Sequence, residues 1–277
     1  MTRSPVPPDA ADRADPVPDA LVARLRAAGC VFAEEEAALL RAAATGAADL
    51  EALADRRVTG EPLETVLGWV AFAGRRVAVG PGVFVPRRRT ELLARAAVDL
   101  ACAAAGTPAA GGPVVVELCC GVAAVATVVA QDVPGTRVHA ADVDPVAVRW
   151  AAHNLGDHGA ATTGDLFDAL PADLRGRVDL LVANAPYVPT HAVATMPVES
   201  RAHEPRVAVD GGADGVDVQR RLLAGVDAWV RPGGHVAVET GERQAPVTAA
   251  AFPAGWVTHV LRDDDLDGTV VVGRRPA

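Results

Sequence analysis

The chain has 277 residues, enough for one large domain or for a large domain with a small companion. Half of its residues are apolar and 22% are charged, which is the composition of a soluble globular protein. Its net charge of −9, with no lysine in the sequence, argues against a general nucleic-acid binder, because such proteins carry a basic surface.

The cysteines, the histidines and the N-terminus indicate a cytoplasmic protein without a metal site. The four cysteines show neither metal-type pair spacing nor the framework of a small secreted domain, so we expect reduced thiols at Cys30, Cys102, Cys119 and Cys120. The seven histidines lack ligand spacing. Residues 1–17 lack the apolar core of a signal peptide and predict a disordered tail. No uninterrupted apolar run reaches about 18 residues, so we expect no membrane span.

Three short helical patterns follow the tail and predict a small helical domain over residues 18–65. The helices are expected at residues 20–28, 33–44 and 48–57, with Gly29 and Gly46 as C-terminal stops. Their apolar seam would consist of Leu21, Leu25, Leu39, Leu40, Leu50 and Leu53. No residue in these helices is diagnostic of chemistry, and we expect this domain to recognise the substrate.

A hairpin and a long helix come next. Residues 66–86 are predicted to be a β-hairpin linker, with strands at residues 66–72 and 77–79 joined through Gly74. A helix is expected at residues 90–105, with Thr90 as its candidate N-cap. The main domain is therefore expected to cover residues 87–277.

From Gly111 onward, apolar strand-like runs alternate with helical patterns, which is typical of a parallel sheet with crossover helices. Strands are expected at residues 114–118, 137–142, 160–163, 178–184 and 235–239, and helices at residues 123–131, 145–154, 166–170 and 216–230. Two more strands, at residues 256–262 and 268–274, end the chain. The predicted fold is α/β, a mostly parallel Rossmann-like sheet closed by an antiparallel C-terminal hairpin, which resembles class I S-adenosylmethionine-dependent methyltransferases.

The only tyrosine of the chain lies in the motif Asn184-Ala185-Pro186-Tyr187, directly after the apolar run at residues 178–183. This motif places an amide oxygen, a backbone carbonyl and an aromatic face at the carboxyl edge of a sheet, where open α/β sheets bind ligands. Such a group of atoms can hold a planar NH2 group. The alternative is a proline turn closed by a half-buried tyrosine.

Features at three earlier strand ends favour a nucleoside cofactor. The loop from Glu117 to Ala123 is rich in small residues that let a ligand approach the backbone. Asp142 stands at about the 20-residue offset expected for an acid that accepts both ribose hydroxyls. Asp165 could accept from an adenine amino group while Leu166 packs on the ring, and Asp165 could equally cap a helix. The predicted cofactor-binding residues are Glu117, Cys119, Gly121, Ala123, Asp142, Asp165, Leu166 and Asn184.

The chain resembles the HemK/PrmC family of protein-(glutamine-N(5)) methyltransferases over roughly residues 20 to 275. The motifs that carry the resemblance are Glu61-Pro62-Leu63, Leu67-Gly68, Val85-Pro86-Arg87 with Thr90-Glu91, the Glu117–Ala123 loop, Asp142, Asp165-Leu166-Phe167, Asn184 to Tyr187, Glu204-Pro205, Gly211 to Gly215, and Pro232-Gly233-Gly234 before Glu239. The resemblance implies S-adenosyl-L-methionine as cofactor. It also implies a protein acceptor, either a translation release factor or another protein with a glutamine-containing loop.

The resemblance further assigns the catalytic residues as Asn184, Ala185, Pro186 and Tyr187. By this resemblance, Asn184 Oδ1 and the Ala185 carbonyl would accept the two amide hydrogens of the glutamine, and Tyr187 would flank the glutamine amide. The methyl group is already activated by the positive sulfur, so alignment and electrostatics would carry the catalysis without a strong base.

The sequence departs from the family pattern at four positions, which suggests a divergent paralogue. Cys119 and Ala123 replace the outer glycines of the cofactor loop, so each added Cβ either narrows the methionine pocket or requires an ordinary backbone conformation. Ala185 replaces the first proline of Asn-Pro-Pro-Tyr but keeps the carbonyl, and Arg88 stands in place of another proline.

Three alternatives remain open at this point. Amino groups of nucleic-acid bases or small molecules also suit an Asn-x-Pro-Tyr motif, although the net acidity makes direct action on nucleic acid unexpected. A non-catalytic scaffold protein could retain the fold and lose the cofactor. The adjacent Cys119 and Cys120 could also act as redox groups or nucleophiles, although buried cysteine usually behaves as a small hydrophobe.

Overall fold

The structure is a computed structural model that describes residues 19–106 and 111–277. It contains two compact units, Met1–Leu63 and Glu64–Ala277. The predicted disordered tail, residues 1–17, lies outside the described residues. In the described part of the chain, no helix combines the length and the apolar character needed to cross a membrane.

The first unit is helical, as the sequence predicts. Its helices are α1 (Ala20–Ala27), α2 (Ala33–Ala43) and α3 (Ala47–Val58). Leu25 and Leu40 are fully buried in the seam between them. Leu39, which was expected in the same seam, is exposed, because the buried face of α2 is formed by Ala33, Ala37 and Leu40.

The second unit opens with α4 (Leu63–Leu67) and the hairpin of β1 (Trp69–Phe72) and β2 (Arg75–Ala78). The prediction of a strand from residue 66 is wrong, because residues up to Leu67 are helical and Gly68, with φ +81°, ends the helix. The hairpin buries Phe72 and Val77 in the core of the second unit. The side-chain amide of Asn154 holds Ala78 by two hydrogen bonds of 2.9 Å.

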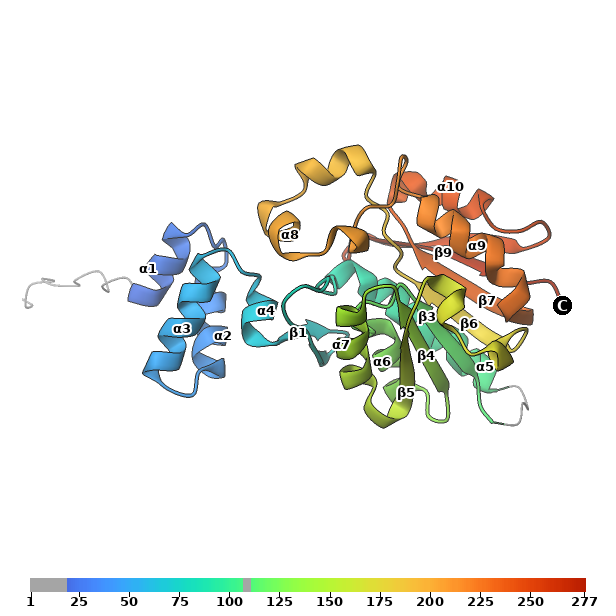
Figure 1. Cartoon of the computed structure of the whole chain (residues 1–277), viewed down its shortest axis with the longest axis horizontal. Helices are drawn as coiled ribbons and strands as arrows, with labels where there is room; N and C mark the ends of the chain where they lie inside the picture. Colours follow the sequence, from blue (N-terminus) through green and yellow to red (C-terminus); the bar gives the residue numbers. More distant parts are fainter. Residues whose placement is uncertain (1–18, 107–110) are drawn as a thin grey trace, which may run out of the picture. The chain divides into compact units, whose positions relative to one another are not determined.

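The second unit is built on a seven-stranded sheet (Figure 1). The strands are β3 (Val114–Leu118), β4 (Arg137–Asp142), β5 (Gly159–Thr163), β6 (Val178–Ala183), β7 (Val230–Glu239), β8 (Val257–Asp263) and β9 (Gly268–Arg274). Their order is β5-β4-β3-β6-β7-β9-β8, parallel from β5 to β7 and antiparallel at β9 and β8. The predicted α/β fold with an antiparallel C-terminal hairpin is confirmed.

Helices cover both faces of the sheet and form a three-layer structure (Figure 1). One layer consists of α5 (Glu91–Ala105), α6 (Ala124–Asp132) and α7 (Pro145–Leu155), and the other contains α9 (Asp217–Trp229) and α10 (Ala245–Ala250). Residues 166–170, predicted as a helix, form a 3-10 turn at Leu166–Ala169. Neither α10 nor α8 (Val198–His203) was predicted, because a helix shorter than two turns shows no clear apolar period.

Thr90 is not the N-cap that the sequence predicts. Its own backbone is helical, with φ −68° and ψ −13°, and its side chain makes no capping hydrogen bond. A 3-10 turn at Arg88–Thr90 leads directly into α5. The Thr90 hydroxyl contacts Asn184 instead.

The topology fixes where a ligand can bind. After β3 the chain adds β4 and β5 on one side, and then returns to place β6 and β7 on the other side. The carboxyl ends of β3 and β6 therefore flank the switch point of the sheet, where open α/β folds hold their ligands. The loop after β3 and the Asn184 motif after β6 meet at this point.

Candidate active site

The loop after β3 keeps a left-handed backbone at both positions where glycine is replaced. Cys119 has φ +53° and Ala123 has φ +58°, and Gly121 between them has φ +53°. The alternative that these two residues require an ordinary conformation is therefore wrong. A residue with a side chain costs about 1–2 kcal/mol in this region, so the loop stores strain that glycine would avoid.

Glu117 is the second-to-last residue of β3 and lies just before this loop. It is 3% exposed, and its Oε2 accepts a hydrogen bond of 2.7 Å from the Ala126 backbone N–H in the first turn of α6. Burial raises the pKa of this carboxyl to about 8. Glu117 thus joins the sheet to the N-terminus of α6, and its predicted contact with a cofactor stays a prediction.

Asp142 ties the ends of β3 and β4 together. Its Oδ2 accepts from Gly121 N at 2.8 Å, and its Oδ1 accepts from Asp144 N at 2.9 Å. Burial raises the pKa of this carboxyl above its usual range. Each oxygen keeps further acceptor capacity, which two ribose hydroxyls could use.

The end of β5 is more open. Asp165 Oδ2 accepts from Arg221 Nη2 at 2.6 Å, and its side chain is 52% exposed. Its side chain makes no capping bond to the following 3-10 turn, so the helix-cap alternative is not supported. Leu166 beside it is nearly buried and has φ +50°, which makes it the third non-glycine residue with a left-handed backbone at the carboxyl edge, after Cys119 and Ala123.

The adjacent cysteines are poorly suited to nucleophilic chemistry. Burial raises the pKa of both thiols, Cys119 and Cys120, above the ordinary value. The thiolate is the reactive form of cysteine, so little of it is present near neutral pH. The geometry favours the interpretation of both residues as small loop residues.

The Asn184 motif presents two acceptors at the end of β6. Asn184 Nδ2 donates to Thr90 Oγ1 at 3.2 Å. Within the described residues, neither Asn184 Oδ1 nor the Ala185 carbonyl oxygen receives a hydrogen bond. Ala185 itself is fully buried, so the carbonyl position is fixed by packing although proline is absent.

Tyr187 is held on both its backbone and its ring. Its hydroxyl donates to Glu239 Oε1 at 3.4 Å, and burial raises the pKa of the phenol to about 12. Gln244 Nε2 donates to the Tyr187 carbonyl at 2.9 Å. A Cβ added at Gly211 would lie 2.6 Å from the Pro186 carbonyl, so only glycine allows that backbone to approach the motif.

Three supporting residues were not assigned to the site from the sequence: Thr90, Glu239 and Gln244. Each contacts the motif from a distant part of the chain, at separations of 94, 52 and 57 residues. Thr90 and Glu239 belong to the motifs that carry the family resemblance, and this was the only indication in the sequence that they could take part in the site.

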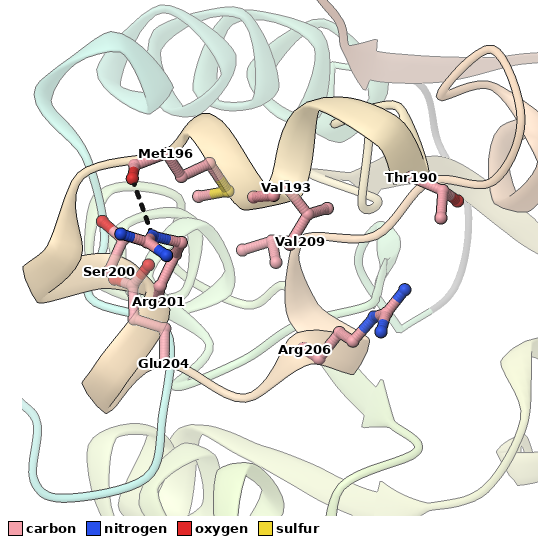
Figure 2. A pocket seen from close by; sticks show the side chains of 9 residues that line it. Thr190, Val193, Met196, Ser200, Arg201, Glu204, Arg206 and Val209 are labelled. Atoms are coloured by element: carbon pink, nitrogen blue, oxygen red, sulfur yellow. Dashed lines mark hydrogen bonds between the residues drawn. The ribbon is translucent and has the colours of Figure 1, made fainter.

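The segment after the motif contains a pocket of about 410 Å³ (Figure 2). Its lining is amphipathic and consists of Thr190, Val193, Ala194, Met196, Ser200, Arg201, Glu204, Arg206 and Val209. Arg201 Nε donates to the Met196 carbonyl at 3.0 Å, as the dashed line in Figure 2 shows. The isolated bridge between Val188 and Asp210 closes this segment beside Tyr187.

Glu204 anchors this pocket to the start of the second unit. Its buried carboxylate pairs with Arg87, and its Oε1 accepts from Val85 N at 3.3 Å. The ion pair and the backbone N–H compensate for the burial of the Glu204 carboxylate.

Comparisons with known proteins agree with this geometry. A family model described as the methyltransferase small domain matches residues 107–204. A release factor glutamine methyltransferase of Streptomyces coelicolor is 38% identical over 204 residues, which cover 73% of this chain and 71% of the relative. The chain belongs to the HemK/PrmC family of glutamine methyltransferases.

The chain is also similar to a second methyltransferase and to a solved structure. A 4-amino-L-phenylalanine/4-methylamino-L-phenylalanine methyltransferase of Streptomyces pristinaespiralis is 37% identical and covers 72% of this chain and 68% of the relative. The crystal structure of a methyltransferase from Pyrococcus furiosus superimposes with a TM-score of 0.53 at 15% identity, covering 80% of this chain and 98% of that one. The latter similarity concerns the fold alone.

This HemK/PrmC-family enzyme is an S-adenosylmethionine-dependent methyltransferase. The residues at the switch point fit that cofactor. A Cβ placed on Gly121 would meet no atom within 4 Å, so the loop borders open space beside the Asp142 carboxylate. Asp142 would hold the ribose there, and the cofactor supplies a methyl group activated by its sulfonium.

Proposed function

We propose that this enzyme methylates the side-chain amide nitrogen of a glutamine in a protein. The observation that carries the proposal is the pair of acceptors at the end of β6, Asn184 Oδ1 and the Ala185 carbonyl, which receive no hydrogen bond from the described residues. Two acceptors on adjacent residues match the two N–H bonds of a primary amide.

The chemistry depends on orientation. The lone pair of an amide nitrogen is delocalised into its carbonyl, so the amide is a poor nucleophile. When Asn184 Oδ1 and the Ala185 carbonyl accept both N–H bonds, the lone pair of the nitrogen faces the methyl group of the cofactor. Tyr187 flanks the amide and limits its rotation. Alignment of this kind can supply up to about 7–11 kcal/mol in favourable cases.

For the protein acceptor, we propose a translation release factor, with the pocket after the motif receiving the residues beside the glutamine. The relative from Streptomyces coelicolor carries that substrate in its name. The pocket begins three residues after Tyr187 and offers both apolar side chains and the exposed Arg201. The helical unit is proposed to select the partner.

The test is mass spectrometry of a recombinant release factor after incubation with the enzyme and S-adenosylmethionine. We expect one added methyl group on a glutamine. Asn184→Ala should lower kcat by about 100-fold, because the missing hydrogen bond matters most in the transition state. Arg201→Glu should instead raise KM for the release factor and leave cofactor binding unchanged. An Asn184→Ala enzyme with undiminished kcat would contradict the proposed mechanism.

A second candidate acceptor is the aromatic amine of a free amino acid. The relative from Streptomyces pristinaespiralis favours it, since its name specifies 4-amino-L-phenylalanine at a similar level of identity. An aromatic amine also presents two N–H bonds, so the same two acceptors would serve. Incubation of the enzyme with 4-amino-L-phenylalanine separates the two candidates, and Arg201→Glu should not affect the reaction with the small acceptor.

A further inference from the structure

A buried carboxylate lies behind the acceptor site. Glu239 is the last residue of β7 and is 1% exposed. Its Oε1 accepts from the Tyr187 hydroxyl at 3.4 Å, and its Oε2 has no hydrogen-bond partner among the described residues. The Thr90 hydroxyl also interacts with this carboxylate and lowers its pKa. A carboxylate this deeply buried requires donors, and these two hydroxyls are the donors at hand.

The direction of the hydrogen bonds then follows from proton counting. An ionised carboxylate can only accept, so it attracts the single proton of the nearby Thr90 hydroxyl. The Thr90 oxygen is then an acceptor toward Asn184, which must present its NH2 group at the observed distance of 3.2 Å. The opposite atom of the amide, Oδ1, is consequently turned away from Thr90.

We propose that Glu239 is a positioning residue that, through the Thr90 hydroxyl, orients the Asn184 side-chain amide so that Oδ1 faces the methyl acceptor. Without this constraint, a 180° rotation of the amide would place NH2 where an acceptor is needed. The NH2 group of Asn184 would then face an N–H group of the methyl acceptor, and the site could not hold the acceptor amide. This inference rests on the proposed role of Asn184 in binding the acceptor amide.

The protonation state of Glu239 gives the proposal a pH signature. Burial raises the pKa of this carboxyl to about 7, and the groups that face it are Thr90, the Tyr187 hydroxyl and the positive charge of Arg89. Its neighbour on β9 is the apolar Val270. Below this pKa the protonated acid can donate to Thr90 and release the hydroxyl proton toward Asn184 Oδ1. Activity should therefore rise with pH through about 7.

The chain allows a direct test, because it contains only two asparagines, Asn154 and Asn184. With ¹⁵N-asparagine labelling, the side-chain NH2 region of an NMR spectrum holds two signal pairs. Asn154 Nδ2 donates to the carbonyls of Ala78 and Val122, each at 2.9 Å, away from Glu239. Its signals are an internal control for folding.

The variants are Thr90→Val, Thr90→Ser and Glu239→Gln, measured at about pH 8.5, where Glu239 is ionised. Thr90→Val should shift the Asn184 signals, leave those of Asn154 in place, and lower kcat by about 10- to 100-fold with cofactor affinity and KM within about threefold. Thr90→Ser keeps the hydroxyl and should restore both the signals and kcat. Glu239→Gln can both donate and accept, so it should lower kcat less and remove the pH dependence near 7.

Each outcome bears on the proposal. If the Asn184 signals and kcat of folded Thr90→Val and Glu239→Gln enzymes equal those of the wild type, the proposal is overturned. If Thr90→Val does not fold, Glu239→Gln alone decides, through the Asn184 signals and the pH profile. A purely structural role of Glu239 would change thermal stability and leave both unaltered. If the wild type methylates no glutamine, the proposed function fails, and the NMR signals still test the orientation.

Discussion

Backbone conformation at single residues decides how the cofactor loop tolerates substitution. Ala123 is fully buried and left-handed, whereas Ala126 is equally buried in the regular helix α6. Replacement by glycine removes the same methyl group at both positions. At Ala123 it also relieves about 1–2 kcal/mol of strain, and at Ala126 it adds a helix-propensity cost of about 1 kcal/mol.

We therefore expect Ala123→Gly to be close to neutral and Ala126→Gly to lower the free energy of unfolding by roughly 2 kcal/mol more. Urea unfolding of the two variants measures the difference. Equal destabilisation would mean that the left-handed backbone at Ala123 is not strained, so that alanine costs no more than glycine at this position.

The two acids at successive strand ends should contribute unequally to cofactor binding. Asp142 is partly buried and bonded to the loop backbone, whereas the Asp165 carboxylate is half exposed and paired with Arg221. Asp142→Ala should weaken binding of S-adenosylmethionine by about 1.5–3 kcal/mol, the range for hydrogen bonds to a charged group. Asp165→Ala should cost about 1 kcal/mol or less, because exposed charges are screened. Calorimetry with both variants tests this order, and equal losses would contradict it.

The sequence predicts residues of the candidate site where a motif sits directly after a strand, as at Asp142 and Asn184. It does not predict residues whose place in the site depends on contacts across the fold. Thr90 matched the pattern of a helix N-cap, yet the 3-10 turn before α5 makes capping unnecessary and frees its hydroxyl for Asn184. No local pattern reports a hydrogen bond between residues 94 positions apart.

At the scale of elements, the junction of β3 with α6 depends on one buried acid. The Glu117 carboxyl accepts from the N-terminus of α6, and burial raises its pKa from 4.5 to about 8. Between these values the folded protein keeps a proton that the unfolded chain has lost. Stability from this group is therefore complete at low pH and declines as the pH rises toward about 8, by on the order of 1.4 kcal/mol per unit.

Glu117→Gln keeps an acceptor for Ala126 N but cannot ionise. We expect the melting temperature of the cofactor-free wild type to fall more steeply between about pH 5.5 and pH 8.5 than that of Glu117→Gln. Thermal unfolding of both proteins across this range measures the slopes. Parallel slopes would show that Glu117 titrates near its ordinary pKa and that its burial is relieved by solvent.

Strands and helices were predicted correctly where the apolar pattern was long enough to show its period. The buried strands β3 and β6 and the helices α7 and α9 emerge within one or two residues of the expected bounds. The pattern failed at α4, where the apolar Val66 and Leu67 resemble the beginning of a strand. A single turn of helix before Gly68 has no periodicity that could have distinguished the two.

At the scale of the whole molecule, the chemistry and the choice of partner are proposed to lie in separate units. The hydrophobic clusters around the sheet draw all their residues from the second unit, beginning at Val70. The residues of the candidate site lie there as well, from Thr90 to Gln244. A unit with its own core is expected to fold independently.

A protein that begins at Glu64 should therefore fold and bind S-adenosylmethionine within about threefold of the full chain, a difference below 1 kcal/mol. The boundary matters, because a later start at Val70 would remove α4 and the first residue of β1. Activity on a short glutamine-containing peptide should be retained, while kcat/KM for an intact release factor should fall, since the helical unit is proposed to recognise that partner. Circular dichroism establishes folding, calorimetry measures cofactor binding, and the two acceptors are compared by mass spectrometry. A folded truncation that loses cofactor binding would show that the helical unit contributes to the site, and an unchanged kcat/KM for the release factor would remove that unit from substrate selection.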